Sequence, residues 1–266
     1  MVIELSKFIL KTRMVHLQDA DEVRMILRTH TRYYEEILGI PGLLQDPILT
    51  FGYQNIDQDA PPGSNPPLQR LRRFLVEEGK LRRVGNLVRS IVRPYPRMPV
   101  GFHYSSLSEL LRARGNSVVS LDLYDKRAEL RYDMNQPVPE SEYKKYGTLI
   151  DIGCLEHLFD TAQCLENCIR MIRCGGHYVL VTSVNGDFGH GLHVFNPQGL
   201  IDCFVGNGFK IVYLKYSTVS GKPISDPSTS SDSLIWMVGR KEQGLPAFVC
   251  PQQEIWRNYE NYAPAM

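Results

Sequence analysis

Apolar and polar positions alternate in two ways along the second half of the chain. Short, nearly continuous apolar runs predict strands buried in a sheet, whereas apolar positions three or four residues apart predict helices. The predicted strands cover 116–125, 128–139, 146–155, 177–184, 210–219 and 233–241, and the predicted helices cover 105–115, 160–176 and 196–209. This alternation indicates a doubly wound α/β fold with a mainly parallel sheet. The last two strands have no helix between them and are predicted to form an antiparallel hairpin at one edge.

The first hundred residues follow a less regular pattern. Helical spacing after an acidic start, β-rich runs broken by glycine, and proline clusters mark the successive elements. In chain order these are a helix over 19–38, a strand and turn over 46–56, a loop over 57–67 and a basic helical stretch over 68–93. Further on, Asn196 is expected to cap the helix over 196–209, with Pro197 in its first turn.

The segment YGTLIDIGCLEHLFD, residues 146–160, decides how the strands are numbered. Its apolar run ends in an acid and a glycine, as the first strand of many nucleotide-binding domains does, but no glycine-rich loop follows. If it were the first strand, the next strand, 177–184, should end in a carboxylate that holds ribose hydroxyls, and it does not. Two upstream strands do end in acids, Asp122 and Asp133. The segment is therefore predicted to be the fourth strand, and the first strand lies just before Gly52.

With this numbering the chain resembles the class I S-adenosylmethionine-dependent methyltransferases over about residues 105–240. That family has a seven-stranded sheet ending in a β-hairpin, and its fourth strand often ends in Leu-Glu-His, here Leu155-Glu156-His157. The next helix runs into Gly-Gly and the fifth strand, here CIRMIRCGGHYVLVT. The resemblance implies a Rossmann-like methyltransferase fold with an N-terminal helix and a helical insertion after the first strand. The implied division is 1–45 as a helical segment, 46–240 as the α/β domain with the insertion at 57–104, and 241–266 as a tail.

The resemblance also implies where S-adenosylmethionine would bind. The family's first strand is followed by an acid and a Gly-x-Gly-x-Gly turn, whereas this chain offers Gly52 alone. Asp122 would accept both ribose hydroxyls, with Asp125 as an alternative and a solvated turn acid as the plainer role. Asp133 would meet the adenine amine or else form a turn. The candidate cofactor-binding residues are Gly52, Tyr53, Gln54, Asp122, Leu123, Asp133, Met134, Gly153 and Cys154.

Three histidines are candidate catalytic residues at the same edge of the sheet. His157 follows the fourth strand, and His190 and His193 lie in the loop GDFGHGLHVFNP, residues 186–197. An imidazole titrates near neutral pH, so any of them could take a proton from an acceptor hydroxyl. The plainer roles are helix capping by the Leu-Glu-His segment and a purely structural loop. His157, His190, His193 and Cys154 could together bind a metal, but they come from two loops, so no metal is expected.

Composition and charge add limits to this interpretation. No apolar run is long enough for a membrane span, no signal peptide is recognised, and the six cysteines lie in mostly apolar segments, so buried free thiols and a cytoplasmic location are expected. The net charge is only +1, yet nine Lys or Arg residues against two Glu residues give +7 between Arg70 and Arg97. This basic stretch is expected to form a lid or a docking surface for an anionic partner, or a solvated helical pair.

Three functions remain open from the sequence. The first is methyl transfer from S-adenosylmethionine to a small molecule, possibly a sugar, a phosphorylated or another anionic metabolite. The second is a non-catalytic binding module whose turn at Gly52, Tyr53 and Gln54 no longer admits the cofactor. The two differ in whether those residues frame an open pocket beside Asp122 or fill it. The third, nucleic-acid methylation, is disfavoured because the basic stretch has few aromatic residues to stack bases.

Overall fold

The computed structural model describes residues 25–26, 30–56, 106–187 and 189–252. The strands are β1 (Met25–Ile26), β2 (Ile48–Phe51), β3 (Asn55–Ile56), β4 (Val118–Leu121), β5 (Tyr146–Ile152), β6 (Ile172–Asn185), β7 (Phe209–Ser217), β8 (Pro223–Ile224) and β9 (Ser233–Lys241). The α-helices are α2 (Thr31–Leu38), α5 (Leu107–Ala113), α6 (Thr161–Met171) and α7 (Pro197–Gly206). Short 3-10 turns are η2 (Glu140–Glu142), η3 (Leu155–His157) and η4 (Pro227–Thr229).

Seven strands form one sheet in the order β4-β2-β5-β6-β9-β7-β8. The pairs β4–β2, β2–β5 and β5–β6 are parallel, and β9 runs antiparallel to both β6 and β7. The predicted fold class is thereby confirmed, including the antiparallel pair at the end of the chain. The strand before Gly52, β2, lies inside the sheet between β4 and β5, so the prediction that it precedes YGTLIDIGCLEHLFD in the sheet is correct. That segment, β5, is the third strand of the sheet in chain order rather than the fourth.

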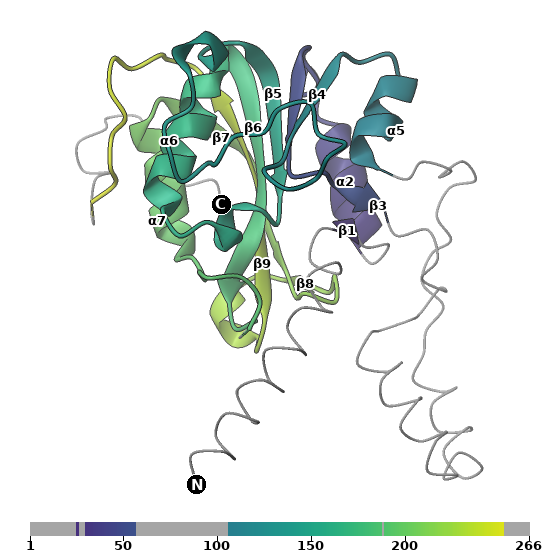
Figure 1. The fold of residues 1–266 in the computed structure, drawn as a ribbon. Coiled ribbons are helices and arrows are strands. Elements are labelled where there is room, and N and C mark those ends of the chain that lie inside the picture. Colours follow the sequence, from purple (N-terminus) through teal and green to yellow (C-terminus); the bar gives the residue numbers. More distant parts are fainter. Residues whose placement is uncertain (1–24, 27–29, 57–105, 188, 253–266) are drawn as a thin grey trace, which may run out of the picture.

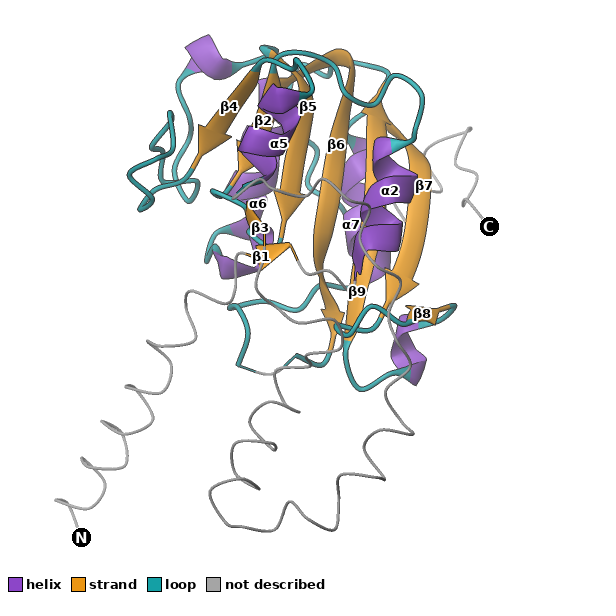
Figure 2. Cartoon of the chain, turned by 90° about the vertical axis from the view of Figure 1, so that its right-hand side faces the viewer, coloured by secondary structure: helices purple, strands orange, loops and turns teal. Residues whose placement is uncertain are grey.

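The sheet is sandwiched between two helical layers. Figure 1 shows α6 and α7 on one face and α2 and α5 on the other, and Figure 2 views the sheet with α2 and α5 in front. Successive strand residues point to opposite faces, so each central strand supplies both cores. In β9, for example, Met237 packs with Phe204 of α7, whereas Trp236 packs with Tyr33 of α2 in a stack with ring centroids 4.6 Å apart.

The predicted third strand, 128–139, is reduced to one bridge. Leu130 pairs with Leu121 of β4, and the segment then turns away from the sheet. The cause is local, because Asp133 Oδ1 accepts hydrogen bonds from both the backbone and side-chain nitrogens of Asn135 and so forms a turn. The sheet still has seven strands because the two-residue β8 pairs with β7 at the opposite edge.

Two predicted helix limits are wrong. Residues 160–176 were expected to be helical up to the glycine pair, but α6 ends at Met171 because Ile172 already pairs with Tyr146 of β5. The buried Lys241 ammonium donates to the carbonyls of Ile169 and Ile172 and so satisfies backbone acceptors at this helix end. Near the N-terminus, the described part of 19–38 contains the strand β1, paired with β3, before α2 begins at Thr31.

The segment just after β2 lies against the start of α5. The Leu107 N–H donates to Gln54 O at 2.9 Å, and Ser108 Oγ lies 3.0 Å from Thr50 Oγ1 of β2. Ser106 caps α5, because its hydroxyl accepts from the Glu109 N–H. Residues 57–105 lie outside the described part, so their assignment as a basic helical insertion, like the domain division, stays a prediction.

The remaining expectations concern the tail, the thiols and the membrane. Val249 exchanges hydrogen bonds with the side chain of Asn207 after α7, so the described part of the tail docks on the domain itself. All six cysteines are free, and four are buried while Cys174 and Cys250 are exposed. Within the described residues, no helix is both long and apolar enough to cross a membrane.

Candidate functional site

The carboxyl ends of β2, β4, β5 and β6 bring the predicted site residues to one edge of the sheet. Between β2 and β5 the chain connections diverge to opposite sides, and such a switch point is where open α/β sheets bind ligands. The edge has two parts. We call the first, around Gly52 and Asp122, the glycine turn, and the second, around Glu156, His157 and His190, the histidine corner.

The glycine turn is tightly packed. Gly52 has φ +76°, and a Cβ atom there would lie 2.4 Å from the Sγ of Cys154. The Gln54 side chain is fully buried, and its Nε2 donates to Phe51 O at 2.8 Å and to Cys154 Sγ at 3.2 Å. Its Oε1 is buried and has no hydrogen-bond partner within the described residues. Protein atoms thus occupy the space that the missing side chain of Gly52 leaves.

Asp122 is the acid that meets this turn. Its carboxylate is 4% exposed, with Oδ2 accepting from the Tyr53 N–H at 3.1 Å and Oδ1 accepting from the amides of Tyr124 and Asp125. Asp125, the alternative, instead forms an ion pair with Arg127. A carboxylate has about four lone-pair sites, so a ribose hydroxyl bound to Asp122 must share it with these amides.

The Tyr53 ring is also packed within the protein. Its residue is 7% exposed, and the Arg127 guanidinium carbon lies 3.9 Å from the ring centroid, which is a cation–π contact. The opposite charge of Asp125 raises the pKa of Arg127, chiefly through their hydrogen bonds, so this cation is permanent. The Tyr53 side chain therefore packs against Arg127 and the Gln54 side chain against Cys154, and both are buried within the protein.

The other predicted cofactor-binding residues have varied surroundings. Asp133 forms the turn with Asn135 described above, and Met134 is buried in the core between the sheet and α6. Leu123 is 38% exposed, and Gly153 has φ +72°. Contacts of these residues with S-adenosylmethionine stay predictions.

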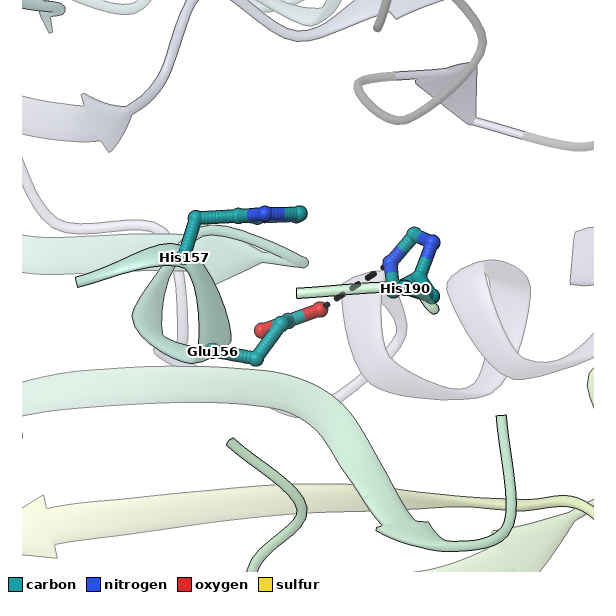
Figure 3. A group of neighbouring side chains, drawn as sticks. All are labelled: Glu156, His157 and His190. Carbon is teal, nitrogen blue, oxygen red and sulfur yellow. Dashed lines mark ion pairs between the residues drawn. The ribbon is translucent and has the colours of Figure 1, made fainter. Parts of the chain in front are cut away.

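The histidine corner lies beyond β5 and β6. Glu156 and His157 are in η3, and His190 comes from the loop after β6 (Figure 3). One carboxylate oxygen and one nitrogen from each ring all lie within 4.8 Å of one another. The structure thus brings together two of the three predicted catalytic histidines, and joins them to Glu156.

Backbone contacts hold the loop against Glu156. The Glu156 carbonyl accepts from the N–H groups of Leu192 and His193, and Gly191, with φ +70°, lies so close that a Cβ there would be 3.0 Å from the Glu156 side chain. Glycine is required for this approach, since other residues strain at positive φ. Asp160, which caps α6 by accepting from the Gln163 N–H, fixes the chain just after η3.

Charge in the histidine corner is concentrated on a buried carboxylate. Glu156 is 2% exposed, and its Oε2 accepts from the Thr182 hydroxyl at 2.8 Å, while Oε1 lies 3.7 Å from His190 Nε2. Glu156 raises the pKa of His190 above its usual value. Burial and then the Glu156 charge raise the pKa of Asp151 well above its usual range.

His193 does not join the corner. Its Nε2 lies 3.1 Å from Phe159 O, and its ring packs near Phe159 and Phe195. Cys154, the other ligand considered for a metal set, faces the glycine turn and donates to Phe51 O. The loop therefore divides its two histidines between different surroundings.

Comparisons with known proteins add a fold-level context. No family model matches the sequence, and no curated protein is significantly similar to it. Among solved structures, 1,6-didemethyltoxoflavin-N1-methyltransferase from Burkholderia thailandensis, with bound 1,6-didemethyltoxoflavin and S-adenosylhomocysteine, is 16% identical over 51% of this chain and 66% of that one, with a TM-score of 0.36.

Two further structures match to a similar extent. A putative methyltransferase from Bacillus halodurans is 13% identical over 52% of this chain and 87% of that one, with a TM-score of 0.38. The [4+2]-cyclase SpnF is 13% identical over 51% and 71% of the two chains, with a TM-score of 0.37. These sequence identities and TM-scores are too low to indicate which reaction the protein catalyses. The fold assignment rests on the observed strand order instead.

Sequence reasoning missed three residues that shape this edge. Thr182 and the adjacent Ser183 follow the apolar run Tyr178–Val181 of β6, and that polar break was the available signal. Gly191 stood in a glycine-rich loop but had no partner in the sequence. Arg127 gave no signal, because its contact with Tyr53 joins residues 74 positions apart.

Proposed function

We propose that this protein transfers the methyl group of S-adenosylmethionine to a small-molecule acceptor at the carboxyl edge of its sheet. The observation that carries the proposal is the placement of the glycine turn at the switch point between β2 and β5, with Asp122 beside it and the histidine corner on the adjoining strands. Asp122 and the backbone at Gly52 and Gly153 are the groups that would hold the cofactor.

The cofactor would supply a methyl group on a sulfonium, and an acceptor nucleophile would attack its carbon in line as the carbon–sulfur bond breaks and S-adenosylhomocysteine leaves. The protein's share is to align the acceptor and to exclude water. His190, whose pKa Glu156 raises, is suited to take the proton that an acceptor hydroxyl or amine loses as the new bond to carbon forms. The buried Glu156 carboxylate then stabilises the imidazolium.

Exposed apolar side chains near the histidine corner suit an acceptor that is partly apolar. Phe159, Leu192 and Val194 are 81%, 62% and 45% exposed and lie on the segments that carry His157 and His190. An acceptor with an apolar face would cover these side chains. The anionic acceptor suggested by the basic stretch depends on residues outside the described part, and stays a prediction.

A second candidate function is a non-catalytic binding module. The observation in its favour is the tightly packed glycine turn, where the buried Gln54 side chain contacts Cys154 and the buried Tyr53 ring contacts Arg127. In this candidate function the packed side chains leave no room for the cofactor at the turn.

Calorimetric titration of the full, tag-free chain with S-adenosylhomocysteine tests the two candidates. Saturable binding with a micromolar Kd supports methyl transfer, whereas no heat and no thermal shift at millimolar ligand supports the binding module. The Gln54→Ala variant sharpens the result, because it removes the side chain that fills the turn. Binding that appears only in Gln54→Ala shows that Gln54 closes the site and contradicts the catalytic proposal for the natural chain.

A further inference from the structure

The geometry points to a divalent transition-metal site formed by Glu156, His157 and His190. The inference concerns metal binding and does not depend on the methyl transfer proposed above, although His190 would be a ligand in the metal-bound protein and a proton acceptor only in the metal-free protein. It differs from the expectation drawn from the sequence, which considered His193 and Cys154 as partners and no metal as the outcome.

The ligand atoms are close to the spacing that a metal imposes. A tetrahedral zinc site with bonds of about 2.0–2.1 Å places neighbouring ligand atoms about 3.4 Å apart. Glu156 Oε1 and His190 Nε2 are 3.7 Å apart, and the widest separation within the three is at most 4.8 Å. Figure 3 shows the two rings and the carboxylate converging from η3 and from the loop after β6, so small rotations of the rings close the set.

The donor types favour one class of ion. Two imidazoles and one carboxylate suit Zn²⁺, Fe²⁺, Co²⁺ or Mn²⁺, whereas Mg²⁺ prefers oxygen ligands and keeps its water. Three protein ligands also leave positions open for water or an oxygen atom of another molecule, as catalytic rather than structural sites do.

A supporting hydrogen bond is already in place. Metal-bound carboxylates are usually oriented by an outer donor, and Thr182 Oγ1 donates to Glu156 Oε2 at 2.8 Å, which directs Oε1 toward His190. The backbone bonds from Leu192 and His193 to the Glu156 carbonyl hold the His190 loop against η3. The ligand set is therefore preorganised by contacts that do not involve the ion.

The buried carboxylate of Glu156 also favours the binding of a cation. Glu156 is 2% exposed, and burying a carboxylate is costly unless an opposite charge compensates it. The positive partner that the described residues offer is His190, at 3.7 Å, which is longer than a hydrogen bond. A divalent ion bound between them supplies the charge at bonding distance.

Titration of the full, tag-free protein with Co²⁺ after chelator treatment tests the site. The Cys174→Ser/Cys250→Ser background removes the two exposed thiols, which could also bind the ion. We expect one equivalent of Co²⁺, with a visible spectrum of nitrogen and oxygen ligands that Zn²⁺ abolishes and Mg²⁺ does not.

The matched variants are His190→Ala and His193→Ala, two histidines of one loop of which only the first lies in the cluster. Changing an outer-shell group alone weakens metal sites about 10–100-fold, so losing His190 should weaken binding by at least about 100-fold, whereas His193→Ala should bind as before. Glu156→Gln, which keeps the shape and can keep the bond from Thr182, should also lose the ion.

Three results would overturn the inference. They are no stoichiometric Co²⁺ in the parent protein, equal binding by His190→Ala, and equal losses in His190→Ala and His193→Ala. Circular dichroism of each variant separates a lost ligand from a lost fold. If His190→Ala is unfolded, the loss of Co²⁺ binding is tested with Glu156→Gln instead.

Discussion

The glycine turn and the histidine corner occupy neighbouring positions on one sheet edge, yet they use their polar groups in opposite ways. At the turn, the Asp122 carboxylate accepts three backbone N–H groups, and a Cβ on Gly52 would collide with Cys154. At the corner, the Glu156 carboxylate accepts one hydrogen bond from a hydroxyl group. Its distance to the His190 ring is longer than a hydrogen bond, and the His157 ring lies within 4.8 Å. The first arrangement stabilises the fold, and the second is suited to an additional partner.

The two carboxylates differ in the groups that hydrogen-bond to them rather than in their burial. Both Asp122 and Glu156 are nearly fully buried, so burial alone does not distinguish them. The donors do, because backbone amides cannot leave Asp122 without unfolding the turn, whereas imidazole rings can rotate toward an ion. Removing each group should therefore affect stability and binding to different degrees.

The largest effect is expected for Asp122→Ala. It leaves three backbone N–H groups without this acceptor, and each such loss costs about 1–3 kcal/mol, so the free energy of unfolding should fall by at least about 3 kcal/mol. Urea denaturation measures this change. Asp125→Ala is the matched control, since it removes a partly exposed ion pair with Arg127 and one backbone hydrogen bond from the Arg127 N–H, and should cost about 1–2 kcal/mol. Equal losses in the two variants would mean that Asp122 does not hold the turn.

A smaller effect is expected for Gly52→Ala. The backbone penalty at positive φ is about 1–2 kcal/mol, and the contact with Cys154 Sγ adds to it. Gly42→Ala is the control, because Gly42 has φ +71° but nothing within 4 Å of its Cβ position. Chemical denaturation should show Gly52→Ala as the more costly by at least about 1 kcal/mol. Adding Cys154→Ala should recover part of that difference, and no recovery would contradict the packing described here.

The smallest effect is a pH dependence at the histidine corner in chelator-treated protein. Since the pKa of His190 is raised in the folded state, its protonated form adds stability below the unfolded value of about 6.5. That stability is lost as the pH rises through the folded pKa. Its size should be under about 1 kcal/mol, as for partly exposed ion pairs. Denaturation of wild type and His190→Gln across pH 5 to 9 should differ only in this slope, and parallel curves would show that the two groups do not interact.

Much of the fold could be predicted because it depends on local periodicity. The strand before Gly52, the hairpin at the end of the chain and the Asn196 cap all follow from residue order and are present in the structure. The third strand was overestimated, since the turn at Asp133 competes with pairing to β4. The early end of α6 could not be foreseen either, because pairing of Ile172 with Tyr146 depends on a strand 26 residues away.

The candidate site was predicted only in part. The sequence indicated His157 and His190 as candidates because imidazole can act as an acid or a base. Their distance from Glu156 depends on the close approach of the Gly191 loop to η3, which the sequence does not reveal. The same limit applies to the turn, where Gln54 meets Cys154 across 100 positions of sequence. Contacts of this kind come from the assembled sheet rather than from any periodic pattern.

The hydrogen bond from Leu107 to Gln54 has a consequence for how the chain tolerates change. This bond holds Gln54 next to Leu107. The entropy cost of closing the stretch of chain between these two residues therefore grows by only about 0.6 kcal/mol for each doubling of its length. A change in the length of that stretch should therefore cost little stability and leave the register of β2 with β4 and β5 unchanged.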